Sequence, residues 1–348
     1  MNENIKETAE RLRKQIEAEQ KDKLKIALFG QPGAGKSSLI NRIVGQNVAR
    51  TGAGTDITVE AQVIEHEDLL LVDLPGYGTS KFPPNDWFQE FSPMDYDLFL
   101  CVFSGKFHEA DTSFFQLLKN SGKVCLFVRN KHDDLWQEGK EVHEIEQEIA
   151  QDVEKQVGGK QPVYFVSCRK QTGLELLVDG IQNALDPAKK EKYLRSAKAY
   201  TAKHLQDKKA ACDKLVYTHA GLAAANGLNP IIGLDIGVDI SIIVNLFTKI
   251  RAAYGLSDAK INNLGSSMLP LGKKVIDIAS KEGVALLLKR YAATEATKEI
   301  AKWIPLVGQA IAASAGFAMT LSVGKSYLND CHTLATQILD QEMALPQR

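Results

Sequence analysis

Short apolar runs and amphipathic stretches alternate along the first half of the chain. Apolar side chains recur at helical spacing in four stretches, residues 36–45, 109–121, 137–156 and 173–184. Five short runs with strand character separate them: residues 24–29, 69–72, 98–103, 124–128 and 163–166. Strands that alternate with helices form crossover units, which give a mostly parallel sheet with helices on both faces. The pattern therefore predicts an α/β domain over residues 23–185.

Both flanks of this domain are helical in pattern. The N-terminal segment predicts an amphipathic helix whose apolar stripe consists of Ile5, Ala9, Leu12 and Ile16. After residue 185 the strand-like runs stop, and residues 186–348 are rich in Ala, Leu, Lys and Ile, which predicts about five to seven helices. Because an unpaired stripe needs a partner, we expect residues 1–22 to pack with this all-α domain.

Composition and charge narrow the class of protein. The 348 residues are 44% hydrophobic and 24% charged, as in soluble globular proteins. A net charge of −1 provides no overall field for nucleic acid, so none is expected as a partner. Five cysteines without a Cys-x-x-Cys pair indicate a reducing compartment. The charged N-terminus lacks a secretory signal, and Asn2 excludes N-myristoylation, so we expect a cytoplasmic protein.

A phosphate-loop pattern, Gly30-Gln-Pro-Gly-Ala-Gly-Lys-Ser37, follows the strand-like run 24–29 and opens the next helix. Its glycines let backbone N–H groups face the phosphates, Lys36 reaches the β and γ phosphates, and the Ser37 hydroxyl ligates Mg²⁺. The residues expected to bind the nucleotide here are Gly30, Gly33, Ala34, Gly35, Lys36, Ser37 and Ser38.

The choice of base depends on Asn130-Lys-His-Asp133, which fits the Asn-Lys-x-Asp guanine signature after the run 124–128. The Asp133 carboxylate can accept two hydrogen bonds from the guanine N1–H and exocyclic amine, and adenine offers no such donor pair. Lys131 would cover the base and Asn130 would brace the loop. The last strand ends in a short loop expected to reach the guanine carbonyl through backbone N–H groups of Ser167, Cys168 and Arg169.

Two further elements concern the γ-phosphate and the metal. Asp73 would hold Mg²⁺ through water, and the Gly76 N–H would sense the γ-phosphate. A switch threonine that completes the Mg²⁺ shell is expected in residues 50–60, where Thr55 and Thr58 both qualify and Thr58 is preferred; a surface loop with incidental threonines is the alternative. Together the motifs predict one site for GTP or GDP with Mg²⁺ at the carboxyl ends of the strands.

The residues between these motifs resemble the immunity-related GTPases, interferon-inducible relatives of the dynamin superfamily. The resemblance rests on Asp73-Leu-Pro-Gly-Tyr-Gly-Thr, Phe82-Pro-Pro84, Tyr96-Asp97-Leu-Phe, Phe127-Val-Arg129, Pro230-Ile-Ile-Gly-Leu-Asp-Ile-Gly-Val-Asp-Ile and Trp303-Ile-Pro-Leu-Val-Gly308. It implies a Ras-like GTPase domain joined to a helical domain built from both termini. Lys36 is similar to the Lys-containing class of that family, and Asn130 stands where members often have Thr.

Hydrolysis needs a group that orients water. Tyr77 follows the Asp-x-x-Gly element where Ras-type enzymes carry Gln, so slow intrinsic turnover is expected. The resemblance implies activation when two GTPase domains meet across their nucleotide faces, and hence a GTP-dependent dimer or oligomer. Gln31 is a candidate for placing water, with loop filling as an equal alternative. A slow GTP-gated switch that recruits a protein partner is the alternative function.

Three stretches bear on membranes. Residues 303–324 carry no charge and are long enough to span a bilayer, but their many small residues favour a buried helix over a membrane-inserting one. Residues 230–247 place Asp235 and Asp239 on one helical face, which favours burial against other helices. Residues 188–214 hold nine Lys or Arg against three acidic residues. This stretch is either a solvated helix face or a surface for anionic lipid, which would make the protein peripheral to membranes.

Overall fold

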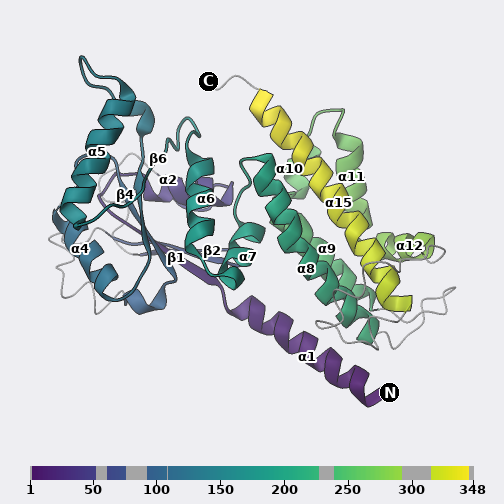
Figure 1. The fold of residues 1–348 in the computed structure, drawn as a ribbon. Helices are drawn as coiled ribbons and strands as arrows, with labels where there is room; N and C mark the ends of the chain where they lie inside the picture. The colour runs from purple at the N-terminus through teal and green to yellow at the C-terminus, as the bar shows by residue number, and fades with distance from the viewer. Residues whose placement is uncertain are drawn as a thin grey trace. The chain divides into compact units, whose positions relative to one another are not determined.

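The computed structural model describes residues 2–51, 61–75, 92–107, 109–226, 239–291 and 315–344. The chain divides into two compact units, drawn in Figure 1. The sheet unit comprises Lys23–Tyr200, and the helical unit comprises residues 1–22 together with Thr201–Pro346. Thr55, Thr58, Gly76, Tyr77 and Asp235 lie outside the described residues, so their expected roles stay predictions.

Within the described residues, the sheet unit is built on six strands in the order β2-β3-β1-β4-β5-β6. These strands are β1 (Leu24–Phe29), β2 (Gln62–His66), β3 (Leu69–Asp73), β4 (Leu98–Phe103), β5 (Cys125–Arg129) and β6 (Val163–Phe165). Neighbouring strands are parallel except that β2 runs antiparallel to β3 at one edge. This arrangement confirms the predicted mostly parallel sheet, and it adds β2, which the apolar runs did not indicate.

Helices cover both faces of the sheet, because alternate residues of a strand point to opposite sides. On one face Leu24, Ile26 and Leu28 of β1 share a core with α2 (Lys36–Val44), α6 (Leu174–Ala184) and α7 (Pro187–Ser196). On the other face Ala27 and Phe29 share a core with α4 (Glu109–Asn120) and α5 (Val142–Val157). The loops that follow β1, β3, β5 and β6 are therefore all attached to one sheet that is packed on both faces.

The sheet unit continues beyond the boundary expected at residue 185. Asp186 caps α7 by accepting hydrogen bonds from the backbone N–H groups of Ala188 and Lys189. Tyr193 of α7 is fully buried in the sheet core, and Arg195 pairs with Asp68 at 2.8 Å. The sequence pattern could not indicate that α7 belongs to the sheet unit, because α7 has the composition of a polar helix. Only the position of its buried tyrosine against the sheet shows where it belongs.

The described part of the helical unit comprises α1 (Asn2–Lys21), α8 (Ala202–Asn226), α9 (Ile240–Ala253), α10 (Asp258–Asn262), α11 (Leu269–Ile278), α12 (Lys281–Tyr291) and α15 (Ala315–Ala344). The long helices α8 and α15 pack against each other, and α9 packs on both. Phe247 of α9 stacks on Tyr327 of α15 with ring centroids 3.9 Å apart. Leu12 of α1 is buried beside Leu222 of α8.

The stretches considered for membrane contact are placed as follows. In the described part of 303–324, α15 buries Phe317, Met319, Leu321 and Val323 within the helical unit. Asp239 is the N-cap of α9, since its carboxylate accepts from the Ser241 N–H at 3.0 Å. None of the helices in the described ranges has the length and apolar character needed to cross a membrane.

The basic stretch 188–214 does not form one exposed helical face. It is divided between α7 of the sheet unit and α8 of the helical unit. Lys192, Arg195 and Lys208 are buried, and Lys189 pairs with Asp97 at 3.0 Å. Of its nine basic residues, all of them described, Lys203 alone is exposed, and the others are buried or half-buried.

Candidate nucleotide-binding site

The phosphate loop connects β1 to α2 through glycines in left-handed backbone conformations. Gly30 has φ +127° and Gly35 has φ +90°, and Lys36 begins α2. A Cβ on Gly30 would lie 2.0 Å from the Val102 carbonyl oxygen. One on Gly35 would lie 2.3 Å from Nδ2 of Asn130. Glycine is therefore required at both positions, and the loop presents the backbone N–H groups at the start of α2 as an anion site.

The loop lysine and serine meet the aspartate at the end of β3. Lys36 Nζ donates to the carbonyls of Gly30 at 3.1 Å and Gln31 at 3.4 Å, and it lies 3.9 Å from Asp73 Oδ1. The Ser37 hydroxyl donates to Asp73 Oδ2 at 2.5 Å. The structure thus brings together three residues that the sequence assigned to phosphate and metal, while Ser38 follows in the first turn of α2.

Burial disfavours both charges of this group. Desolvation lowers the pKa of Lys36, and the nearby Asp73 carboxylate offsets part of that effect. Desolvation also raises the pKa of Asp73, against the influence of Lys36 and Ser37. Among the described residues, the buried Asp73 Oδ1 has no hydrogen-bond partner. A buried cation beside an under-satisfied carboxylate and a hydroxyl suits a phosphate group together with a hard divalent cation, which prefers oxygen ligands.

Asn130 links the guanine element to the phosphate loop. This buried side chain donates from Nδ2 to the Ala34 carbonyl at 2.8 Å. Its Oδ1 accepts from the backbone N–H of Cys168 at 3.2 Å. Lys131 follows in the left-handed region at φ +57°. The bracing role predicted for Asn130 therefore has a geometric basis, and it extends to two loops.

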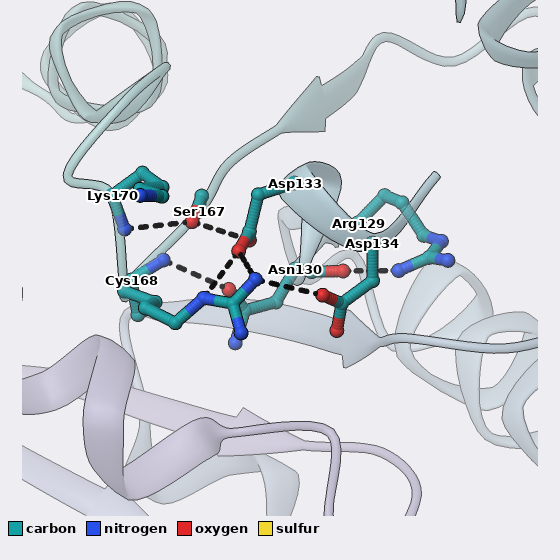
Figure 2. A network of polar contacts seen from close by, with 8 residues as sticks. Arg129, Asn130, Asp133, Asp134, Ser167, Cys168 and Lys170 are labelled. Atoms are coloured by element: carbon teal, nitrogen blue, oxygen red, sulfur yellow. Dashed lines mark hydrogen bonds and ion pairs between the residues drawn. The ribbon is translucent and has the colours of Figure 1, made fainter. Parts of the chain in front are cut away.

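Asp133 lies at the centre of a polar network on the loops after β5 and β6 (Figure 2). Ser167 Oγ donates to its Oδ1 at 2.5 Å, and Arg169 donates to its Oδ2 from Nε at 2.6 Å and also from Nη2. Arg169 Nη2 also reaches Asp134 Oδ1 at 3.0 Å. Burial opposes ionisation of Asp133, but the bonds from Ser167 and Arg169 outweigh it and lower its pKa below 3.8. Asp133 is thus held as a carboxylate.

Gln31 is placed against the loop after β4. Its Nε2 donates to the Lys106 carbonyl at 2.7 Å and to Asp111 Oδ2 at 3.1 Å. Asp111 is itself buried in the first turn of α4. Both donor hydrogens of the Gln31 amide are used in this way, so the side chain fixes the phosphate loop to its neighbouring loop.

Sequence reasoning missed three residues that shape the site. Asp111 holds Gln31, Asp134 shares Arg169 with Asp133, and Arg42 Nε donates to the Cys168 carbonyl at 2.7 Å. Asp134 could have been noticed as a second carboxylate next to the guanine motif. Asp111 and Arg42 carry no such signal, because their partners are 80 and 126 residues away in the sequence.

Comparison with known proteins adds an independent finding. The family model described as interferon-inducible GTPase matches residues 1–341, nearly the whole chain. The chain belongs to the interferon-inducible GTPase family. It is therefore a guanine-nucleotide-binding GTPase, as the motifs and the resemblance predict.

Known proteins align with the chain at low identity over most of its length. Interferon-gamma-inducible GTPase 10 of Mus musculus is 24% identical, over 94% of this chain and 82% of that protein. Interferon-inducible GTPase 5 of Bos taurus is 25% identical, over 94% and 77%. T-cell-specific guanine nucleotide triphosphate-binding protein 2 of Mus musculus is 28% identical, over 70% and 64%.

Proposed function

We propose that this GTPase hydrolyses GTP at the site formed by the loops after β1, β3, β5 and β6, and that it does so fastest when two copies associate through their GTPase domains on or near a membrane. One observation carries the assignment of the site. The Ser37 hydroxyl and the Asp73 carboxylate meet at 2.5 Å beside buried Lys36, at the mouth of the phosphate loop.

The chain's own residues divide the work of binding. The N–H groups at the start of α2 and the Lys36 ammonium hold the β and γ phosphates. Asp133 accepts from the guanine N1–H and 2-amino group, with Ser167 fixing its carboxylate at 2.5 Å. Ser37 and Asp73 would hold Mg²⁺, which supplies charge neutralisation at the phosphates when bound. Thr58 remains the preferred switch threonine within this proposal.

Self-association is proposed because Gln31, the candidate for orienting water, is held by other partners. Gln31 uses both of its amide hydrogens on Lys106 and Asp111. Tyr77 stands where Ras-type enzymes carry Gln. A second GTPase domain facing the nucleotide can supply or position the missing group, and the rate per molecule then depends on how much dimer is present.

The test is GTP turnover per molecule measured over a range of protein concentrations. Lys36→Ala is the blank and ATP is the specificity control. A rate per molecule that rises with concentration, specific for GTP and absent in the variant, supports the proposal. A constant rate across the range in which the protein self-associates contradicts dimer activation. Capture of a protein partner only with a non-hydrolysable GTP analogue would then favour the slow GTP-gated switch.

The membrane part of the proposal requires a structural change in the helical unit. The uncharged stretch 303–324 supplies an apolar segment, but its described half is buried in α15, and the basic stretch 188–214 has little exposed charge. Insertion would therefore need part of α15 to leave its neighbours. Co-sedimentation with anionic and with neutral vesicles, loaded with GTP analogue or GDP, tests this. Equal low binding in all four conditions contradicts it.

A further inference from the structure

The network around Asp133 contains more donors than guanine recognition requires. A carboxylate offers about four acceptor positions on its two oxygens. Ser167 uses one on Oδ1, and the Arg169 guanidinium directs Nε and Nη2 at Oδ2. Guanine needs two acceptor positions for its N1–H and 2-amino donors. The bond from Ser167 is compatible with a bound base, whereas the two contacts from Arg169 compete with it.

The Arg169 guanidinium and the guanine edge present the same chemistry to a carboxylate. Each is planar and offers adjacent N–H donors, and such forks pair with carboxylates in a bidentate way. The side chain of Arg169 is 68% exposed, and Asp133 is 13% exposed. The arginine can therefore move into solvent, while the aspartate stays fixed by Ser167.

Asp134 provides the arginine with a second acceptor. Its Oδ1 lies 3.0 Å from Arg169 Nη2, and its side chain is 53% exposed. The same guanidinium therefore contacts both carboxylates. A small rotation of the arginine toward Asp134 would release Oδ2 of Asp133 without leaving the guanidinium unpaired.

We propose that the Arg169 side chain is a guanine surrogate that occupies Asp133 in the nucleotide-free protein and transfers to Asp134 when the base binds. This inference rests on the proposed function, since it takes Asp133 as the residue that recognises guanine. Arg169 and Asp134 together set the affinity for guanine nucleotides. The arginine prevents an unpaired carboxylate in the empty protein, and it reduces the fraction of molecules that are ready to bind.

The apparent dissociation constant increases as the competent fraction falls. Because partly exposed ion pairs are weak, the effect of the arginine on GDP affinity is about two- to fivefold. Arg169→Ala should therefore bind GDP about two- to fivefold more tightly. Asp134→Ala should bind GDP more weakly by a similar factor, since the displaced arginine loses its alternative partner. The double variant should equal Arg169→Ala, because Asp134 acts through the arginine.

The experiment is a titration of the full-length, nucleotide-free protein and its variants with fluorescent GDP, with ADP as the second ligand. Arg169→Gln keeps much of the length of the side chain. It controls for a change in loop conformation that truncation to alanine could cause. Lys160→Ala, in the exposed loop between α5 and β6, removes the same charge elsewhere and controls for general attraction of the polyphosphate. Affinity for ADP should not increase in either Arg169 variant, because adenine makes no use of Asp133. A thermal melt of each variant verifies folding.

Several outcomes would overturn the inference. Equal or weaker GDP binding by both Arg169 variants means that the arginine supports the site instead of competing with the base. A loss of affinity in Asp134→Ala that persists in the double variant means that Asp134 acts by another route. One such route is Arg129, whose pKa is lowered by burial and raised in part by the Asp134 carboxylate. Asp133→Ala distinguishes failure of the guanine assignment from failure of the surrogate role of Arg169. If it binds GDP like the parent, the guanine assignment itself fails. If it loses GDP while the Arg169 variants are unchanged, the surrogate role alone fails.

Discussion

The side-chain amide of Asn130 donates to the carbonyl oxygen of Ala34 at 2.8 Å and so joins two loops that are 96 residues apart in the sequence. The same side chain accepts from the Cys168 N–H. The phosphate loop and the loops that follow β5 and β6 are therefore connected through one buried amide. Loss of this side chain would therefore affect the conformation of all three loops.

Replacing Asn130 with alanine should reduce both stability and nucleotide affinity. The Ala34 carbonyl and the Cys168 N–H would each lose a buried partner, at about 1–3 kcal/mol for each unsatisfied group. We expect a lower free energy of unfolding in urea and a loss of GDP affinity of about tenfold or more. Asn120→Ala, at an exposed position at the end of α4, is the matched control. Similar losses in both variants would contradict the coupling.

Gly35 and Gly33 should respond differently to alanine. Both have positive φ, so both variants carry a backbone strain of about 1–3 kcal/mol. A Cβ on Gly35 would also meet Asn130 Nδ2 at 2.3 Å, whereas one on Gly33 has no described atom within 4 Å. Gly35→Ala should therefore lose GDP binding much more than Gly33→Ala, as measured by calorimetric titration. Equal losses would show that strain alone decides.

Tyr193 should matter for the stability of the sheet unit. Its ring is fully buried in the core with α2 and α6, and truncating a large aromatic side chain in a core costs about 3–5 kcal/mol. Tyr193→Ala should unfold at a lower urea concentration than the parent. The shift in urea midpoint that GDP causes should occur in that same unfolding transition. Tyr193→Phe is the control, because the hydroxyl has no partner within the described ranges and its removal should be nearly neutral or stabilising. If the GDP-stabilised transition of Tyr193→Ala had the same urea midpoint as that of the parent, α7 would not be part of the unit that binds GDP.

The stability contribution of Asp133 should depend on pH in the acid range. Its carboxyl has a pKa below the ordinary value of 3.8, since the bonds from Ser167 and Arg169 outweigh desolvation. A carboxyl with a lowered folded-state pKa stabilises the folded protein above its unfolded pKa, and this contribution is lost as pH falls through the folded pKa. The melting temperature of the nucleotide-free parent should therefore exceed that of Asp133→Asn most at neutral pH. The difference should shrink below pH 3.8, and a difference that grows with acid would reverse the assigned sign.

Local sequence was sufficient for the parts of the site that rest on contiguous motifs. The predicted phosphate and guanine motifs, residues 30–37 and 130–133, need particular side chains at fixed spacing, because each motif lies within one short loop. The strands that carry them were visible as apolar runs, since parallel strands are buried on both faces. The edge strand β2 was missed, because Gln62, Glu65 and His66 break its apolar pattern.

The sequence by itself therefore determined the ligand class and the α/β and all-α character of the two halves, and it predicted the residues of the phosphate and guanine motifs. Tertiary structure alone decided that α7 belongs with the sheet, that Asp111 holds Gln31, and that Arg169 lies between Asp133 and Asp134. A sequence motif reflects the residues that a single loop needs in order to bind its ligand. Contacts between loops depend on which strand ends the sheet brings together, and no single segment carries that information.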